Sequence, residues 1–145
     1  MISKKTKYAI NALVYLAKQP KGEPTQIGRI AESENIPRKF LESILLDLKN
    51  AGMLSSRKGK TGGYYLHKTV HEINIAEVMR LFDGAIALLP CVTHRYYEKC
   101  EECKNEGLCG IRDVFLDVRN ETVSILSRAT LHDIITRSEK LKRRK

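Results

Sequence analysis

Long apolar runs are missing from this sequence. No stretch approaches the roughly 20 apolar residues that a helix needs to cross a bilayer. The N-terminal residues Met1 to Lys5 contain no apolar segment of a secretion signal. We therefore expect a cytoplasmic protein without a membrane segment. The chain of 145 residues is long enough for one modest hydrophobic core with an appended helix.

The common catalytic motifs are also missing. The sequence contains no Ser-His-Asp set, no pair of catalytic acids, no phosphate-binding glycine loop and no dinucleotide-binding fingerprint. We therefore expect no enzyme, and a redox or metal-handling enzyme is the least favoured function.

Cysteine is scarce and confined to one segment. The four cysteines all lie within 19 residues; they are Cys91, Cys100, Cys103 and Cys109. In a reducing compartment such a group indicates metal or redox chemistry rather than a disulfide framework. Four thiolates suit an iron–sulfur cluster, [2Fe–2S] or [4Fe–4S], and equally a tetrahedral zinc ion. A thiol–disulfide switch is a further alternative, although no thioredoxin-like βαβ pattern surrounds the C-x-x-C pair.

Positive charge is concentrated in the first half of the chain. Lys and Arg number 26 against 17 Asp and Glu, which gives 26 − 17 = +9. Residues 1–68 carry 13 basic and 5 acidic residues, whereas residues 69–145 carry 13 and 12. A basic half suits a polyanion such as DNA, although a solvated lysine-rich face has the same composition.

Helical periodicity and breakers predict a helix-turn-helix in the first half. Apolar spacing predicts helices over 5–18, 26–34 and 38–51, with Thr25 as the N-cap of the second. Because Pro37 separates the second helix from the third, the two form a helix-turn-helix.

Residues 53–66 predict a β-hairpin. Its two apolar ends flank a glycine-rich, cationic centre, which places Arg57, Lys58 and Lys60 near the tip. A hairpin that follows a helix-turn-helix is a wing, which can contact the DNA backbone or the minor groove. We therefore predict a mainly α fold in which residues 1–68 are a winged helix-turn-helix.

Residues 69–145 predict a sensor and dimerisation region. Helices are expected over 71–83 and 130–141, with an acidic loop over 88–110 that contains the cysteines. Between them, apolar residues recur in steps of four and three; they are Ile111, Phe115, Val118, Thr122, Ile125 and Ala129. This spacing is typical of a helix that packs along another helix. The partner is either this chain itself or, as we favour, a second copy in a homodimer.

Residues 30–64 and the first helix carry a family resemblance. The matching residues are Tyr8, Ala9, Leu13, Leu16, Ala17, Ile30, Ala31, Ile36, Pro37, Phe40, Leu41, Ile44, Leu45, Leu48, Ala51, Gly52, Ser55, Gly59, Gly62, Gly63 and Tyr64. With the cysteine loop and long helix that follow, the chain resembles the IscR/NsrR/CymR type of bacterial transcription regulators. The resemblance implies a homodimer that binds double-stranded DNA.

The resemblance assigns the helix from Arg38 as the recognition helix. Its residues Arg38, Lys39, Glu42 and Ser43 would face the major groove, and Phe40 would be buried with the helix's leucines and isoleucine. Arg and Lys donate to guanine or phosphate, and a carboxylate accepts from cytosine. Glu42 is equally well explained as a solvated surface acid.

The resemblance also implies how a cluster would be held. Family members with a cluster use three cysteines of this loop, matched by Cys91, Cys103 and Cys109, and a fourth ligand from elsewhere. The fourth-ligand positions of two branches are occupied by Arg112 and Lys7. Cys100 is the substitute and His94 the reserve. A CymR-like regulator without metal, controlled by a small ligand or a partner protein, is the alternative.

Overall fold

The computed structural model describes residues 1–145 and contains six α-helices and one antiparallel hairpin. The elements are α1 (Lys4–Ala17), α2 (Ile27–Glu34), α3 (Arg38–Asn50), β1 (Leu54–Arg57), β2 (Gly63–Leu66), α4 (Ile75–Phe82), α5 (Gly110–Arg128) and α6 (Leu131–Arg143). This order confirms the predicted mainly α fold with a hairpin wing. None of the helices has both the length and the apolar character needed to cross a membrane.

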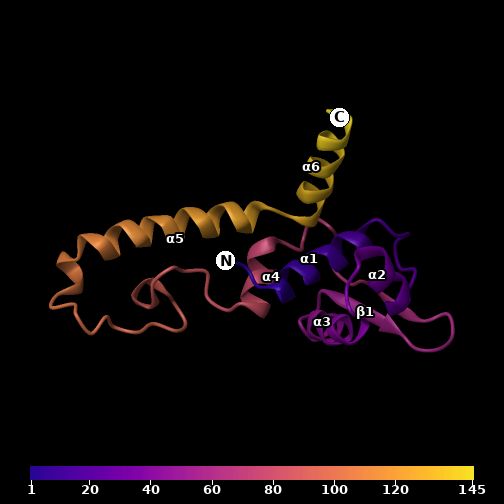
Figure 1. Ribbon diagram of the computed structural model, residues 1–145, viewed down its shortest axis with the longest axis horizontal. Coiled ribbons are helices and arrows are strands. Elements are labelled where there is room, and N and C mark those ends of the chain that lie inside the picture. Colours follow the sequence, from indigo (N-terminus) through magenta and orange to yellow (C-terminus); the bar gives the residue numbers. More distant parts are fainter.

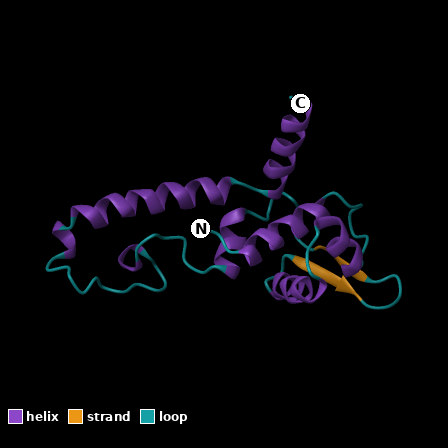
Figure 2. Ribbon diagram, in the orientation of Figure 1, coloured by secondary structure: helices purple, strands orange, loops and turns teal.

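The helices and the hairpin of residues 1–68 gather at one end of the molecule (Figures 1 and 2). Helix α5 extends away from that end, and the chain between α4 and α5 runs alongside it before turning back. Helix α6 then stands out from the same end as α1. The elongated shape leaves most of α5 beyond the reach of the N-terminal helices.

One hydrophobic core holds α1, α2, α3 and the hairpin together. It contains fifteen buried residues, of which three, Ile73, Val78 and Leu131, come from beyond residue 68. Leu13 of α1 and Leu41, Ile44, Leu45 and Leu48 of α3 are completely buried. Because positions 41, 44, 45 and 48 share one face of a helix, α3 keeps its opposite face in solvent.

The turn between α2 and α3 depends on one left-handed residue. Asn35, with φ of 51°, ends α2, and its backbone N–H donates to Ala31 and Glu32. Asparagine tolerates this conformation better than most side chains. Pro37 then starts α3, since the N–H that proline lacks would be unpaired at a helix start. The chain therefore reverses within three residues.

Two predicted helix starts are wrong. Thr25 does not cap α2 but is buried and pairs with Tyr64. The Thr25 N–H donates to the Tyr64 carbonyl at 2.8 Å, and the Tyr64 N–H donates to the Thr25 carbonyl at 2.9 Å. Helix α4 begins at Ile75 rather than near His71, because the Asn74 side chain accepts from the Glu77 N–H at 3.0 Å and caps it. Periodicity alone did not reveal either pairing.

Helix α5 has two unlike long faces. Leu116, Arg119 and Val123 lie on the half-buried face that packs against α4 and the short 3₁₀ turn Pro90–Val92. On another face Ile111, Val114, Val118 and Ile125 are exposed, and no residue of α5 is fully buried. Of the predicted apolar seam, Ile111, Val118 and Ile125 are therefore left uncovered, whereas Phe115, Thr122 and Ala129 are half-buried.

Candidate functional site

The outer face of α3 carries the residues predicted to face DNA. Arg38, Lys39, Glu42 and Ser43 are all exposed. Phe40, expected to be buried, is 38% exposed. It meets Tyr8 of α1 edge to face, with 5.7 Å between the ring centroids. The apolar edge of α3 thus reaches the surface beside the polar face.

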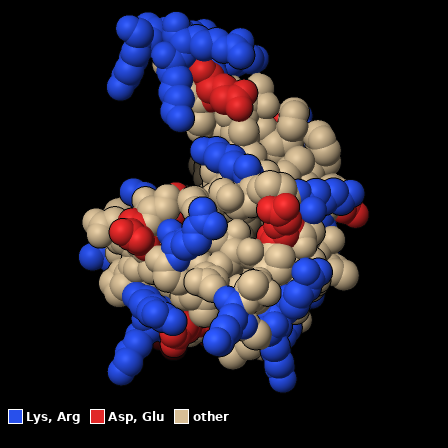
Figure 3. Space-filling view, turned by 90° about the vertical axis from the view of Figure 1, so that its right-hand side faces the viewer, with Lys and Arg blue, Asp and Glu red and all other residues tan.

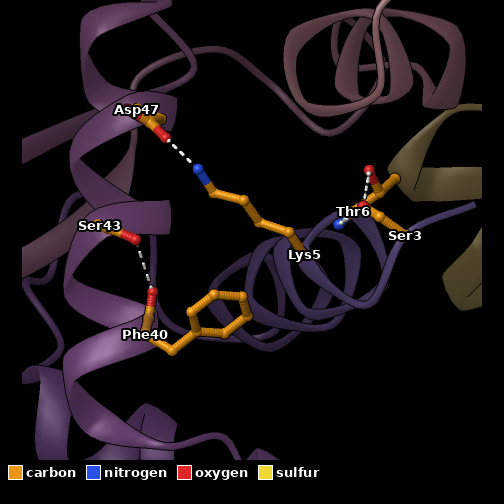
Figure 4. A network of polar contacts seen from close by, with 6 residues as sticks. All are labelled: Ser3, Lys5, Thr6, Phe40, Ser43 and Asp47. Carbon is orange, nitrogen blue, oxygen red and sulfur yellow. Dashed lines mark hydrogen bonds and ion pairs between the residues drawn. The ribbon is translucent and has the colours of Figure 1, made fainter.

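Two of these polar side chains have local partners. The Arg38 guanidinium lies 3.5 Å from the Glu42 carboxylate, one helical turn away. The Ser43 hydroxyl donates to the Phe40 carbonyl at 3.0 Å (Figure 4). Both members of the Arg38–Glu42 pair are largely exposed, so this ion pair is weak and can open. Lys39 has no partner among the ion pairs and remains available.

An ion pair holds α3 against α1. The Lys5 ammonium donates to the Asp47 carboxylate at 2.9 Å, from the N-terminal part of α1 to the C-terminal half of α3 (Figure 4). Both side chains are partly exposed. Such a pair adds little to stability, and α1 and α3 are also joined by their buried core residues.

The hairpin forms the predicted wing. Leu54 pairs with Leu66 and Arg57 pairs with Gly63. Residues 58–61 at the tip are exposed, which includes Lys58 and Lys60. The Arg57 guanidinium lies over the Tyr65 ring, 5.8 Å from its centroid. Three cationic side chains are therefore presented along one edge of the hairpin.

Close backbone contacts set the position of the wing. A Cβ at Gly63, whose φ is 151°, would lie 2.1 Å from the Thr25 carbonyl oxygen. The Gln26 side-chain amide donates to the Lys60 carbonyl at 2.6 Å and joins the tip to the start of α2. Thr25 and Gln26 therefore position the wing, a role that the sequence analysis missed and that the adjacent glycines Gly62 and Gly63 could have signalled.

Basic side chains outnumber acidic ones on the face at the winged-helix end (Figure 3). They project around its rim, and a dense group stands on α6 at the top of that view. A surface of this kind favours a polyanionic partner at low ionic strength.

Both ends of the cysteine loop are anchored near the N-terminus of α5. Cys91 is buried, with 8% of its surface exposed, in the 3₁₀ turn that packs against α5. The Arg112 guanidinium donates through Nε to the Cys91 carbonyl at 3.2 Å. At the other end, Cys109 caps α5, and its sulfur accepts from the Arg112 N–H at 3.4 Å. Arg112 thus bridges the first and last cysteines.

The other thiols differ in their surroundings. Partial burial raises the pKa of the Cys103 thiol above its usual value, and the neighbouring Cys109 and Cys100 raise it further. The Cys103 thiol therefore lies near the Cys109 thiol. Cys100 is exposed, and its sulfur lies 3.7 Å from the Glu102 carboxylate.

The structure does not assemble the four cysteines into one site. No group of three or more His, Cys, Asp or Glu side chains is close enough to hold a metal ion. Cys103 and Cys109 are together, whereas His94 lies on the exposed segment after the buried Cys91. The thiol donors have the chemistry that an iron–sulfur cluster requires, and all four belong to one loop. The ligand set therefore stays a prediction.

Comparisons with known proteins agree over almost the whole chain. A family model described as Rrf2, iron-dependent transcriptional regulator, matches residues 2–137. An rrf2-like HTH-type transcriptional regulator of Rhodobacter capsulatus is 40% identical over 138 residues, covering 93% of this chain and 92% of the relative. The regulator NsrR of Halalkalibacterium halodurans is 28% identical over 136 residues, covering 94% of this chain and 90% of NsrR. The solved structure of CymR, the global cysteine regulator of B. subtilis, superposes with a TM-score of 0.77 at 26% identity, covering 94% of this chain and 96% of CymR.

Proposed function

Because this chain belongs to the Rrf2 family, and is therefore a DNA-binding transcriptional regulator and not an enzyme, we propose that it works as a homodimer whose cysteine loop holds an iron–sulfur cluster. The observation that carries this proposal is Cys109, a candidate ligand that also caps α5, the helix with the unpartnered apolar face. A change at the thiols can therefore reach the dimer contact directly.

DNA reading is assigned to two surfaces of residues 1–68. Arg38, Lys39, Glu42 and Ser43 of α3 enter the major groove, where Arg38 and Lys39 donate to guanine or phosphate. Glu42 can accept from cytosine through its second carboxylate oxygen, since the pair with Arg38 involves only Oε1. Arg57, Lys58 and Lys60 of the wing contact phosphates or the minor groove.

The dimer is assigned to α5. Ile111, Val118 and Ile125 are seven residues apart and exposed, as in a two-helix seam. A second copy of α5 would cover them and place the two α3 helices about 34–36 Å apart, the distance between successive major grooves. Such a dimer would act on bacterial DNA in the cytoplasm, where thiols stay reduced.

The cluster is assigned to Cys91, Cys103 and Cys109, with Cys100 as the fourth ligand and His94 in reserve. When bound, an iron–sulfur cluster supplies a redox- and nitric-oxide-sensitive centre. Support comes from the thiolate donors, which are the ligands such clusters require, and from the iron dependence in the family's description. Arg112 would stay outside the ligand set because it is permanently charged and already binds the Cys91 carbonyl. Its contacts at both ends of the loop hold Cys91 and Cys109 in place.

The DNA proposal is tested by selecting binding sequences from a random duplex library and measuring affinity by fluorescence anisotropy. We expect Lys39→Ala to weaken binding and lower the salt dependence of the affinity by about one unit of slope if Lys39 contacts phosphate. Lys49→Ala, an exposed lysine in the last turn of α3, is the matched control and should bind like wild type. Equal binding by both variants would remove Lys39 from the interface.

The cluster proposal is tested on anaerobically purified protein by absorption spectroscopy with iron and sulfide analysis. We expect visible charge-transfer bands that Cys103→Ala abolishes, together with a change in operator affinity. A colourless protein with stoichiometric zinc would instead support the zinc alternative and contradict the cluster.

A further inference from the structure

A cavity of about 450 Å³ separates the C-terminal end of α4 from the inner face of α5. The segment from Thr93 to Tyr96, which follows Cys91, forms its third wall. The volume falls within the roughly 300–1,000 Å³ of typical small-molecule sites.

The charges that line this cavity all have one sign. Arg80 of α4, Arg95 of the loop and Arg119 of α5 line it together with His94, and no Asp or Glu does. None of the three guanidiniums takes part in any of the three ion pairs of the chain. Arg119 donates only to the neutral amide oxygen of Asn120, at 2.6 and 3.1 Å, so its charge is not compensated.

The remaining lining combines apolar side chains with the polar Thr93 and Asn120. Ala85, Ile86 and Val123 line the cavity, and the Tyr96 ring closes part of it. These apolar side chains reduce the screening by water of the half-buried Arg119 charge, whereas Arg80 and Arg95 are exposed to solvent. Three cations from three separate segments therefore face one cavity, and an anion bound there would reduce their mutual repulsion.

We propose that this cavity, the arginine pocket, binds a small organic polyanion that carries two or more carboxylate or phosphate groups. Arginine forks match such groups through paired N–H donors. One anionic group lies between Arg80 and Arg119, and a second meets Arg95. The apolar walls contact the carbon skeleton between the groups.

The position of the pocket gives its ligand a regulatory role. Helix α4 packs against α1 of the winged helix, whereas α5 carries the dimer seam. A ligand held by both Arg80 and Arg119 would fix the angle between the DNA-reading end and the dimer helix. This regulatory step depends on the proposed function, whereas binding to the pocket does not.

The binding test is isothermal titration of the full-length protein, without DNA, at low ionic strength. The probes are citrate and inorganic phosphate. We expect citrate to bind saturably at one site per chain, and phosphate to bind more weakly because it cannot reach all three arginines. Arg119→Gln should weaken citrate binding at least tenfold. Arg128→Gln, on α5 but outside the pocket, is the matched control and should bind like wild type.

Arg95→Gln is the second variant, in the exposed loop, where a loss of folding is not expected. Absence of saturable citrate binding in wild type would overturn the proposal, as would equal affinities for Arg119→Gln and Arg128→Gln. A third result would also overturn it: the wild type does not bind citrate, and light scattering shows that the wild type is a dimer whereas Arg119→Gln is a monomer. The pocket would then receive an acidic side chain of the second copy. Since no DNA is present, failure here leaves the DNA-binding assignment untouched.

Discussion

Residues 1–68 bury their apolar side chains within the chain, whereas α5 leaves its own exposed. Twelve of the fifteen core residues belong to the first region. In α5 no residue of nineteen is buried, although its apolar side chains recur regularly. The comparison teaches that the winged helix buries its core in a single copy, while the α5 region leaves surface uncovered. The proposed partners for that surface are a second copy at the seam and ligands at the thiols and the arginine pocket.

The largest expected effect would come from charging the seam. Val118→Glu places a carboxylate in the middle of the proposed α5 contact and should convert the dimer to a monomer. Because a dimer that contacts two half-sites binds DNA more tightly than a monomer that contacts one, operator affinity should fall by roughly 10²-fold or more. Light scattering and anisotropy measure the two effects. Ser124→Glu, exposed on α5 and roughly 120° around the helix from Val118, should change neither. A Val118→Glu protein that stays dimeric would contradict the assignment of the seam to a second copy.

Truncating one leucine in each region compares how much each contributes to the free energy of unfolding. Leu45→Ala removes a completely buried side chain and should lower the free energy of unfolding by about 2–5 kcal/mol. Leu126→Ala, half-buried on α5, should cost less than half as much. Urea unfolding at one fixed protein concentration measures both, since dimer stability depends on concentration. Equal costs would mean that α5 is as well packed as α3.

Alanine at two glycines, Gly63 in the wing and Gly28 in α2, distinguishes the effect of close packing from that of helix propensity. Gly63→Ala forces a Cβ against the Thr25 carbonyl and should destabilise the protein by about 3 kcal/mol. Gly28→Ala, in α2 with open space around it, should instead stabilise by about 0.5–1 kcal/mol. Thermal unfolding measures both. A tolerated Gly63→Ala would show that the wing is not held against Thr25.

The smallest effect concerns the cap of α6. The Thr130 N–H lowers the pKa of Asp133, and the Thr130 hydroxyl lowers it further. The ionised carboxylate therefore stabilises the fold above its unfolded pKa of about 3.9, and this contribution is lost as pH falls through the lower folded pKa. Helix content by circular dichroism from pH 6 to pH 2 should show this loss. Asp133→Asn should abolish that component, and Glu139→Gln, exposed on the same helix, should keep it.

Much of the fold of residues 1–68 was predictable because its signals are local. The spacing of Leu41, Ile44, Leu45 and Leu48 predicts which face of α3 is buried, and the glycines and cations of residues 57–63 predict the wing. Thr25 was assigned wrongly because its strand-like pairing with Tyr64 joins residues 39 positions apart. The predicted burial of Phe40 was wrong because helical spacing does not tell how far a neighbouring helix extends over a side chain.

The cysteine loop was harder to predict for the same reason. Its four thiols were evident from spacing, but the bridge from Arg112 to Cys91 spans 21 residues. The arginine pocket was not predicted at all, since Arg80, Arg95 and Arg119 are far apart in the sequence and come together only when α4 and α5 pack.

The sequence by itself determined the helices, the hairpin, the basic half and the family, because periodicity, turn chemistry and composition act over a few residues. Only the tertiary structure decided which apolar face remains uncovered, how the wing is held and which cations share a cavity. Those features depend on packing between distant segments, where the geometry of contact is decided by the whole core.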